Sequence, residues 1–347
     1  MSNRICLVTG IGGLVGSQCA SYFKDKFNQV IGIDNNGRAE FFGESASVQS
    51  TLESLKGIIV WNTDISNRYD VEEIFDAHGS EIDLIIHTAA QPSHDWAASN
   101  PHRDFEVNAL GTLNLLEAYR KYCPNAVFIF TSTNKVYGDR PNLGHFDELE
   151  TRYEPSGYKW RWSVEIDETM SIDQSTHSLF GVSKASADLM VQEYGKYFGL
   201  MTGVFRGGCL TGPGHKGAEQ HGFLNYLVKC IVQEKPYTIY GYQGKQVRDI
   251  IHSYDVVRAF DEFYKVPRMG EVYNIGGGRH SNCSVGEAIS LIEHRTGKTA
   301  MVTYSDQARK GDHRWYITDM TKFKSHYPNW NYTYTLEQII DEIIKSI

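Results

Sequence analysis

Short runs of apolar residues recur along the chain, and segments with helical spacing of apolar positions separate them. Strands that are buried on both faces produce such continuous runs, and helical connections between them favour parallel pairing. The predicted strands are residues 5–8, 30–33, 58–61, 84–86, 127–130 and 203–205, and the predicted helices are residues 14–26, 70–77, 105–122 and 180–198. The pattern predicts an α/β protein built on a doubly wound parallel sheet.

The alternation stops after Arg206, where a segment rich in glycine follows at residues 207–214. Glycine and proline in such numbers mark turns and domain boundaries. The sheet domain is expected to comprise residues 1–206 and about 244–282, and a smaller lobe is expected to comprise residues about 207–243 and 283–347. The sequence therefore predicts two parts, with the larger one contributed mainly by the first half of the chain.

A glycine-rich loop connects the first predicted strand to the first predicted helix, with glycines at Gly10, Gly13 and Gly16. Such a loop lets backbone approach a pyrophosphate, and the helix start offers free N–H groups to the anion. The second strand ends at Asp34, where a carboxylate can accept hydrogen bonds from ribose hydroxyls and repel a 2′-phosphate. The loop therefore favours NAD over NADP, although Arg38 could neutralise a phosphate. A purely structural turn is the alternative.

Composition narrows the classes of protein to which the chain can belong. The 347 residues are 41% hydrophobic and 22% charged, as in an ordinary globular protein. A formal net charge of −8 disfavours nucleic acid as a partner, because such binders concentrate basic residues. No apolar run is long enough for a membrane span, no leader is recognisable, and the six cysteines lack metal-ligand spacing. We expect a cytoplasmic protein with reduced thiols, no metal and no membrane partner.

The glycine spacing reads Gly-x-x-Gly-x-x-Gly, and further motifs stand at residues 111–117, 247–250 and 273–277. In these features the chain resembles the extended short-chain dehydrogenase/reductase family over most of its length. The resemblance implies a Rossmann domain that binds NAD and a lobe that binds a nucleotide sugar. It implies cofactor contacts from Gly10, Gly13, Leu14, Val15, Gly16, Asp34, Asn35, Asp64, Ile65, Thr88, Ala89, Ala90, Asn108, Thr131 and Lys184.

Hydroxyl residues follow the predicted strand at 127–130, on the sheet edge where doubly wound folds bind ligands. The resemblance implies that Thr133 hydrogen-bonds the reacting sugar oxygen; a polar cap at a strand end is the alternative. The family then has Tyr-x-x-x-Lys, in which a tyrosinate takes a sugar hydroxyl proton while hydride leaves the same carbon. The lysine lies on the same helix face and lowers the pKa of the phenol. Here Lys184 is present, but Phe180 stands at the tyrosine position.

Phe180 departs from the family pattern because a benzene ring fills the volume of a phenol and exchanges no proton. An engineered Tyr-to-Phe replacement that holds substrate unreacted is the explanation we favour, since the rest of the machinery is retained. The other explanation is a natural protein that has diverged and uses another group or no chemistry. Tyr137, His177 and Cys209 are candidate substitutes for the missing acid/base group.

A closer resemblance, within the nucleotide-sugar epimerase branch, is to the CDP-tyvelose (CDP-paratose) 2-epimerases. It rests on residues 132–139, 148–153 and 244–249 and on a long insertion that contains residues 166–168. Asn134 and Lys135 stand where 4,6-dehydratases carry an Asp-Glu pair for water loss. The resemblance implies transient oxidation of the sugar by tightly bound NAD, followed by return of the hydride to the other face.

The resemblance implies that arginine side chains bind the sugar diphosphate, because guanidinium groups bind phosphate oxygens in bidentate fashion. Arg248 and Arg314 are the best candidates, with a structural salt bridge as the alternative for each. The full set of candidate substrate contacts is Gln91, Thr133, Asn134, Lys135, Arg206, Gly207, Arg248 and Arg314. The segment at 212–223 lacks the Asp-Gln-Gly-Trp motif of the relatives. The aromatic insertion at 158–162 is a candidate cover for the site, an exposed turn or a subunit contact.

Three functions remain open on the sequence. The first is a nucleotide-sugar epimerase, impaired at Phe180; the second is a nucleotide-sugar oxidoreductase that releases a keto product. The third is a non-catalytic protein that binds NAD and a nucleotide sugar. We expect a homodimer or higher homo-oligomer formed through residues 105–122 and 180–198, as in relatives.

Overall fold

The computed structural model describes residues 4–156, 165–215, 222–308 and 311–347, and these form two compact units. The first unit contains Met1–Thr133, Leu179–Arg206 and Val256–Tyr273, and the second contains Asn134–Ser178, Gly207–Asp255 and Asn274–Ile347. Among the described residues, no helix has the length and apolarity needed to cross a membrane. The six cysteines are all free thiols.

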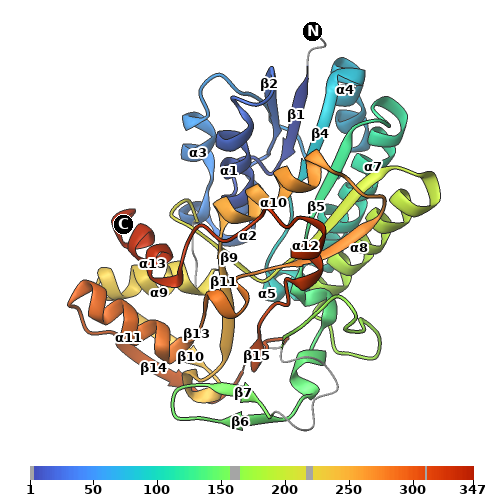
Figure 1. Ribbon diagram of the computed structural model, residues 1–347. Coiled ribbons are helices and arrows are strands. Elements are labelled where there is room, and N and C mark those ends of the chain that lie inside the picture. Colours follow the sequence, from blue (N-terminus) through green and yellow to red (C-terminus); the bar gives the residue numbers. More distant parts are fainter. Residues whose placement is uncertain (1–3, 157–164, 216–221, 309–310) are drawn as a thin grey trace. The chain divides into compact units, whose positions relative to one another are not determined.

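A seven-stranded sheet of order β12-β8-β5-β4-β1-β2-β3 forms the centre of the first unit (Figure 1). Its strands are β1 (Ile5–Thr9), β2 (Gln29–Ile33), β3 (Ile59–Trp61), β4 (Ile82–His87), β5 (Val127–Thr133), β8 (Met201–Gly207) and β12 (Glu271–Ile275). The strand β1 pairs in parallel with β2 on one side and with β4 on the other. This arrangement confirms the predicted doubly wound parallel sheet, with its switch point at the end of β1.

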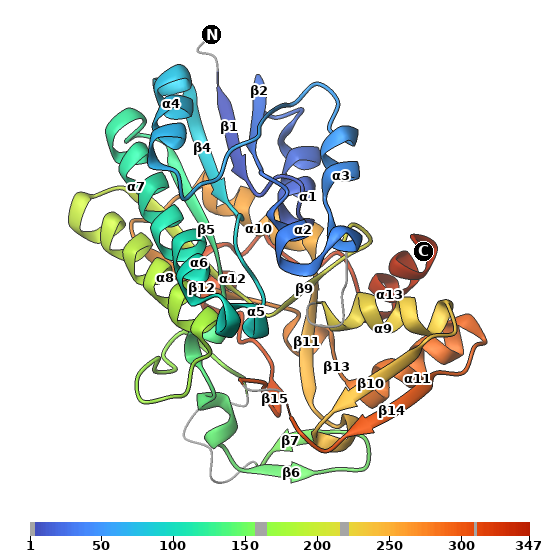
Figure 2. The ribbon, with the colours of Figure 1, turned by 180° about the vertical axis from the view of Figure 1, so that it is seen from behind.

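Two layers of helices accompany this sheet (Figures 1 and 2). They include α1 (Leu14–Phe23), α4 (Arg68–His78), α7 (Gly111–Tyr122), α8 (Leu179–Phe198) and α10 (Ser253–Lys265), with short helices α2 (Gly37–Phe42), α3 (Gln49–Ser54), α5 (His94–Ser99) and α6 (Pro101–Phe105). The helices α1 and α10 are joined by a 2.9 Å hydrogen bond from Tyr22 Oη to Asp261 Oδ2. The helices α4, α7 and α8 pack side by side as the other layer.

The predicted helix at residues 105–122 is divided in the structure. A π-helical turn, η3 (Glu106–Leu110), precedes α7 and brings Asn108 into the interior. An extra residue in a helical turn breaks the regular spacing of side chains and often occurs at functional sites. The apolar periodicity of the sequence continues through this turn, so it could not reveal the break.

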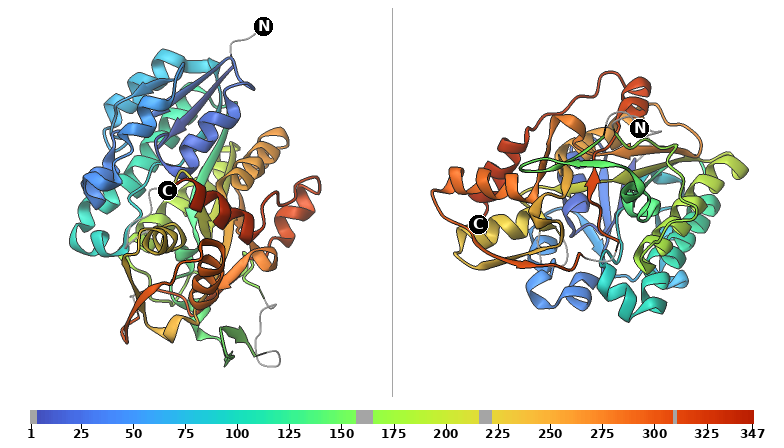
Figure 3. Two further views of the ribbon diagram at one scale, coloured as in Figure 1. Left: turned by 90° about the vertical axis from the view of Figure 1, so that its left-hand side faces the viewer. Right: turned by 90° about the horizontal axis from the view of Figure 1, so that it is seen from below.

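The described residues of the second unit form three small sheets and a helical cluster. Its strands are β6 (Phe146–Glu148), β7 (Tyr153–Pro155), β9 (Cys209–Thr211), β10 (Pro236–Tyr240), β11 (Val247–His252), β13 (Asn282–Ser284), β14 (Met301–Ser305) and β15 (Trp315–Tyr316). The helices α9 (Phe223–Val232), α11 (Val285–Thr296) and α13 (Leu336–Lys345) lie side by side over an aliphatic core, and α12 (Thr321–His326) precedes α13 along the chain (Figures 1 and 3).

The two units differ from the predicted parts of the chain. Residues 134–178, 244–255 and 274–282 were assigned to the sheet domain, but the contacts of the chain place them in the second unit. One reason is that Ile166 N–H donates to Ile317 O at 2.8 Å, while Asn274 Nδ2 donates to Ile166 O at 3.0 Å. These contacts join segments that are distant in sequence. The assignment of nucleotide-sugar binding to the smaller part stays a prediction.

Candidate active site

The glycine loop packs directly against the end of β4. Gly10 has φ +67°, and a Cβ at this position would lie 2.7 Å from the backbone of Ala89. A Cβ on Gly16 would lie 2.1 Å from the carbonyl oxygen of Gly10, so the first turn of α1 lies against the loop itself. Only glycine fits such approaches. The start of α1, with Leu14 and Val15 in its first turn, is thereby held where its N–H groups can meet a pyrophosphate.

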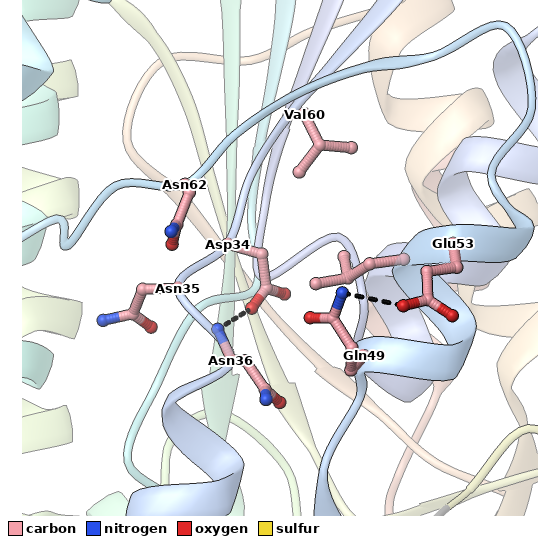
Figure 4. A pocket seen from close by; sticks show the side chains of 8 residues that line it. Asp34, Asn35, Asn36, Gln49, Glu53, Val60 and Asn62 are labelled. Atoms are coloured by element: carbon pink, nitrogen blue, oxygen red, sulfur yellow. Dashed lines mark hydrogen bonds between the residues drawn. The ribbon is translucent and has the colours of Figure 1, made fainter.

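Asp34 follows β2 and anchors the same loop. Its Oδ2 accepts the N–H of Gly12 and its Oδ1 accepts the N–H of Asn36, each at 2.8 Å. Burial is the main cause that raises the pKa of this carboxyl, while the two backbone N–H groups act to lower it. A cavity of about 440 Å³ opens beside the carboxylate (Figure 4), lined by Asp34, Asn35, Asn36, Gln49, Leu52, Glu53, Val60 and Asn62. The cavity and the carboxylate fit the adenosine half of NAD.

Replacement of Asp34 by asparagine tests this fit. D34N keeps the shape of the side chain and removes the charge that repels a 2′-phosphate. A hydrogen bond to a charged group contributes about 1.5–3 kcal/mol, so we expect NAD affinity to fall by at least about tenfold and NADP discrimination to weaken. Titration calorimetry with both dinucleotides measures this, with D25N, an exposed carboxylate, as the matched control. Unchanged preference for NAD in D34N would contradict the assignment.

Other predicted cofactor residues gather at the ends of β1 and β4. Thr88 Oγ1 donates to Thr9 O at 2.7 Å, and Ala89 N–H donates to Thr9 Oγ1 at 3.2 Å. Asp64, predicted near the adenine, forms an ion pair with Arg103 at 2.5 Å. Ile65 is buried. Arg103 could not be predicted from the sequence, because nothing there pairs it with a residue 39 positions earlier.

Lys184 and Phe180 lie one turn apart on α8 and are both buried. Lys184 Nζ donates to Thr131 O at 2.8 Å and lies 4.0 Å from the centre of the Phe130 ring. Burial lowers the pKa of Lys184 to about 7, although the charges of Asp188 and Asp104 act to raise it. The buried hydroxyl Oγ1 of Thr131 has no hydrogen-bond partner among the described residues. A buried amine beside an unsatisfied hydroxyl fits a site for the ribose hydroxyls of the cofactor.

Replacement of Lys184 by methionine is expected to stabilise the chain at neutral and acidic pH. The folded-state pKa of Lys184 lies below the unfolded value of about 10.4, so the unfolded chain binds more protons between these two pKa values. The cost of burying this amine is therefore fully present below pH 7 and fades as pH rises towards 10. Denaturant unfolding should show K184M more stable than the parent by about 2 kcal/mol at pH 6, after the lost bond to Thr131 O is counted, and less stable than the parent by about 1 kcal/mol at pH 9.5, where little of the burial cost remains. A destabilised K184M at both pH values would contradict this assignment.

A hydrogen-bond network near the starts of α5 and α8 includes two residues that were predicted to contact ligands. Asn108 Nδ2 lies 3.0 Å from three acceptors, which are Gln91 O, Asp104 Oδ1 and Ser183 Oγ. Gln91 is fully buried, and its Nε2 donates to Asp104 Oδ1 at 2.7 Å and to Ser93 O at 2.9 Å. Burial raises the pKa of Asp104, whose Oδ2 has no hydrogen-bond partner among the described residues. Asn108 and Gln91 thus hold the backbone of the site.

Arg206 was predicted to contact substrate, and the structure places it in a buried ion pair. Its Nε donates to Asp188 Oδ2 at 3.0 Å and its Nη2 donates to Asp188 Oδ1 at 2.8 Å. Ser132 Oγ donates to the same carboxylate at 2.6 Å. This ion pair connects β8, α8 and β5 inside the first unit.

Two of the candidate substrate contacts, Arg248 and Lys135, lie around one carboxylate in the second unit, where Arg248 is buried and Lys135 is half-buried. Arg248 donates to Asp312, and Lys135 Nζ donates to Gly311 O at 2.8 Å. Burial lowers the pKa of Lys135 to about 8. Burial acts to raise the pKa of Asp312, but the charges of Arg248 and Lys135 outweigh it and lower that pKa to about 2. Arg248 therefore forms the salt bridge that was the structural alternative to phosphate binding.

Arg314 lies among three aromatic rings. Its guanidinium carbon is 5.8 Å from the ring centre of Phe146, 5.4 Å from that of Tyr153 and 5.6 Å from that of Tyr242. Its buried Nε has no hydrogen-bond partner among the described residues. A cation held by ring faces with an unsatisfied N–H retains hydrogen-bonding capacity for an anion.

The three candidate substitutes for the missing phenol are engaged within the second unit. Tyr137 is fully buried and its Oη donates to Asn274 Oδ1 at 2.7 Å. His177 has its two ring nitrogens 2.7 and 3.1 Å from backbone carbonyl oxygens. Burial raises the pKa of Cys209 to about 11. The hydrogen bonds give Tyr137 and His177 structural roles, and the raised pKa favours the protonated thiol of Cys209.

Two predicted surfaces fall wholly or partly outside the described residues. The aromatic insertion at 158–162 lies entirely outside them, so its prediction as a cover for the site stays a prediction. The segment at 212–223 is described only at its two ends, up to His215 and from Gly222.

Comparison with known proteins places this geometry in one family. The model of the NAD dependent epimerase/dehydratase family matches residues 6–276. The CDP-paratose 2-epimerase of Salmonella typhi is 34% identical over 327 residues, which cover 91% of each chain.

Solved structures show the same fold over nearly the whole chain. The Thermus thermophilus UDP-glucose 4-epimerase in complex with NAD superposes with a TM-score of 0.79 at 23% identity, covering 99% of this chain and 98% of that one. A tyrosine-to-phenylalanine mutant of the Bacillus cereus UDP-glucuronic acid 4-epimerase, in complex with a fluorinated UDP-sugar and NAD, has a TM-score of 0.78 at 25% identity, with the same coverage. The chain therefore belongs to the NAD dependent epimerase/dehydratase family, and its cofactor is NAD.

Proposed function

We propose that the chain is a nucleotide-sugar epimerase of the CDP-paratose/CDP-tyvelose 2-epimerase type, whose turnover is impaired by phenylalanine at position 180. The observation that carries the choice of epimerase over dehydratase is the pair of residues after Thr133. They are a buried amide, Asn134, and an ammonium, Lys135, bonded to Gly311 O. Neither can remove and deliver protons as two carboxylates do during loss of water.

The chain's own residues supply positioning in this proposal. NAD, when bound, accepts a hydride from a sugar carbon and returns it. Thr133 hydrogen-bonds the oxygen on that carbon, and Lys184 holds the ribose hydroxyls beside Thr131. Arg314, whose Nε has no partner among the described residues, binds the diphosphate. What Phe180 removes is the phenolic oxygen that would take the hydroxyl proton.

The choice of a CDP-sugar rests on the 34% identity to a CDP-paratose 2-epimerase. Titration calorimetry with CDP, UDP and dTDP measures the preferred base directly, without any need for turnover. We expect CDP to bind at least about tenfold more tightly than the other two. Equal affinity for all three would overturn the CDP-sugar assignment, and no binding of any would overturn the nucleotide-sugar assignment itself.

A non-catalytic binding protein is the second candidate, and Phe180 is the observation that favours it. Such a protein would bind NAD and a nucleotide sugar with ordinary affinity and would stay inert after Phe180 is replaced by tyrosine. Net accumulation of NADH, followed by absorbance, would instead indicate an oxidoreductase that releases a keto product.

A further inference from the structure

His94 is an imidazole in direct contact with the ring that replaces the phenol. It is the first residue of α5, and its ring centre lies 5.1 Å from that of Phe180 at an interplanar angle of 68°. Phe180 lies in the first turn of α8, four residues before Lys184. The imidazole is therefore in contact with the side chain of residue 180, within the first unit. It is partly exposed, whereas Phe180 is buried.

The network around Asn108 holds the backbone near both rings. The amide Nδ2 of Asn108 lies 3.0 Å from Ser183 Oγ and 3.0 Å from Gln91 O. Ser183 Oγ donates to Phe180 O at 3.0 Å, which anchors the first turn of α8. On the other side, the buried Gln91 leads within three residues to His94. One buried amide thus holds the backbone on both sides of the ring contact.

The start of α5 is also fixed locally. Ser93 caps the helix, and its Oγ accepts the N–H of Trp96 at 3.2 Å. The ring of Trp96 packs edge-on against that of Phe41, with 4.8 Å between the ring centres. Ser93 N–H donates to Gln91 Oε1 at 2.5 Å. His94 is consequently carried by a segment whose backbone is held before and after it, as a group that transfers protons requires.

We propose that His94 is the acid/base residue of this chain, in place of a phenol at position 180. This inference rests on the proposed epimerase function. In the forward step the sugar O–H bond breaks and its proton moves to a ring nitrogen of His94. The O–H electron pair becomes the second bond of the carbonyl, and the hydrogen on the same carbon leaves as the hydride that NAD accepts. The return step reverses each transfer, so no oxidant or reductant is consumed.

The test compares slow turnover in four variants over long incubations, with the epimer measured by NMR. We expect H94A to lose at least about 100-fold of the turnover of the parent chain, since general acid–base catalysis contributes about 10²–10⁴-fold. The matched control H102Q changes an exposed histidine of α6 and should keep the parent rate. In F180Y, where a phenol is present, adding H94A should cost less than about tenfold. NAD binding by calorimetry should be unchanged in H94A.

Chemical rescue separates a proton-transfer role from a packing role. Imidazole in the buffer should restore turnover of H94A, because the truncated side chain leaves room for it, and should leave the parent unaffected. The role of His94 would be overturned if H94A turned over at the parent rate or if imidazole failed to rescue H94A. It would also be overturned if the parent chain showed no turnover while F180Y was active. An inert F180Y would instead overturn the proposed epimerase function.

Discussion

Replacement of Phe180 by tyrosine is expected to raise epimerase turnover by at least about 100-fold. The change adds one oxygen to a ring that already has the right volume, so the backbone of α8 need not move. A positioned acid/base group contributes about 10²–10⁴-fold to proton transfer. Lys184, one turn along the same helix, lies over the Phe130 ring and supplies the positive charge that lowers the pKa of a phenol.

The matched control for F180Y is F198Y, which adds the same oxygen to an exposed ring at the end of the same helix. F198Y should turn over at the parent rate. Initial rates with a CDP-hexose at saturating NAD, measured by NMR of the sugar protons, distinguish the two variants. An F180Y no faster than F198Y would show that the missing phenol does not limit turnover.

Replacement of Gly16 by alanine is expected to abolish NAD binding and to destabilise the first unit. The added Cβ would lie 2.1 Å from Gly10 O and 2.8 Å from Ile11 Cα, which are backbone atoms. Relief of this overlap requires the start of α1 to move away from the loop that meets the pyrophosphate. We expect NAD affinity to fall by at least about 100-fold, and the free energy of unfolding to fall by about 1–3 kcal/mol, as in other overpacked cores.

G286A is the matched control, because a Cβ at that position makes only ordinary contacts, at 3.7 Å or more, within the first turn of α11. Alanine in a helix is favoured over glycine by about 0.5–1 kcal/mol, so G286A should be neutral or stabilising and should bind NAD normally. Calorimetry and denaturant unfolding on both variants provide the comparison. Normal NAD affinity in G16A would contradict the assignment of the glycine loop to the cofactor site.

Local sequence was sufficient to predict most of the sheet, because its central strands are buried on both faces and read as continuous apolar runs. The strand β12 was missed since Glu271 and Asn274 interrupt its apolar residues. The assignment of residues 134–178 differs because their partners, such as Ile317, lie far along the chain. No local pattern encodes pairings of that kind.

The residues of the candidate site likewise include some that the sequence could predict and some that it could not. The residues of the glycine loop and Asp34 could be predicted because a strand, a turn and a helix start place them within one short segment. The partners of Gln91 and Arg206, in contrast, are Asp104 and Asp188, which lie on other elements. His94 carried no signal in the sequence, since its contact with Phe180 joins residues 86 positions apart.

In the proposed function, the chain inverts a sugar carbon by removing and returning the same hydride. The most direct measurement uses F180Y, NAD and a CDP-hexose that carries deuterium on the carbon whose configuration changes, in ordinary water. We predict that NMR and mass spectrometry will find the deuterium retained on that carbon in the epimer. Replacement of the deuterium by hydrogen from solvent would contradict the claim, because it would show removal of a proton in place of a hydride.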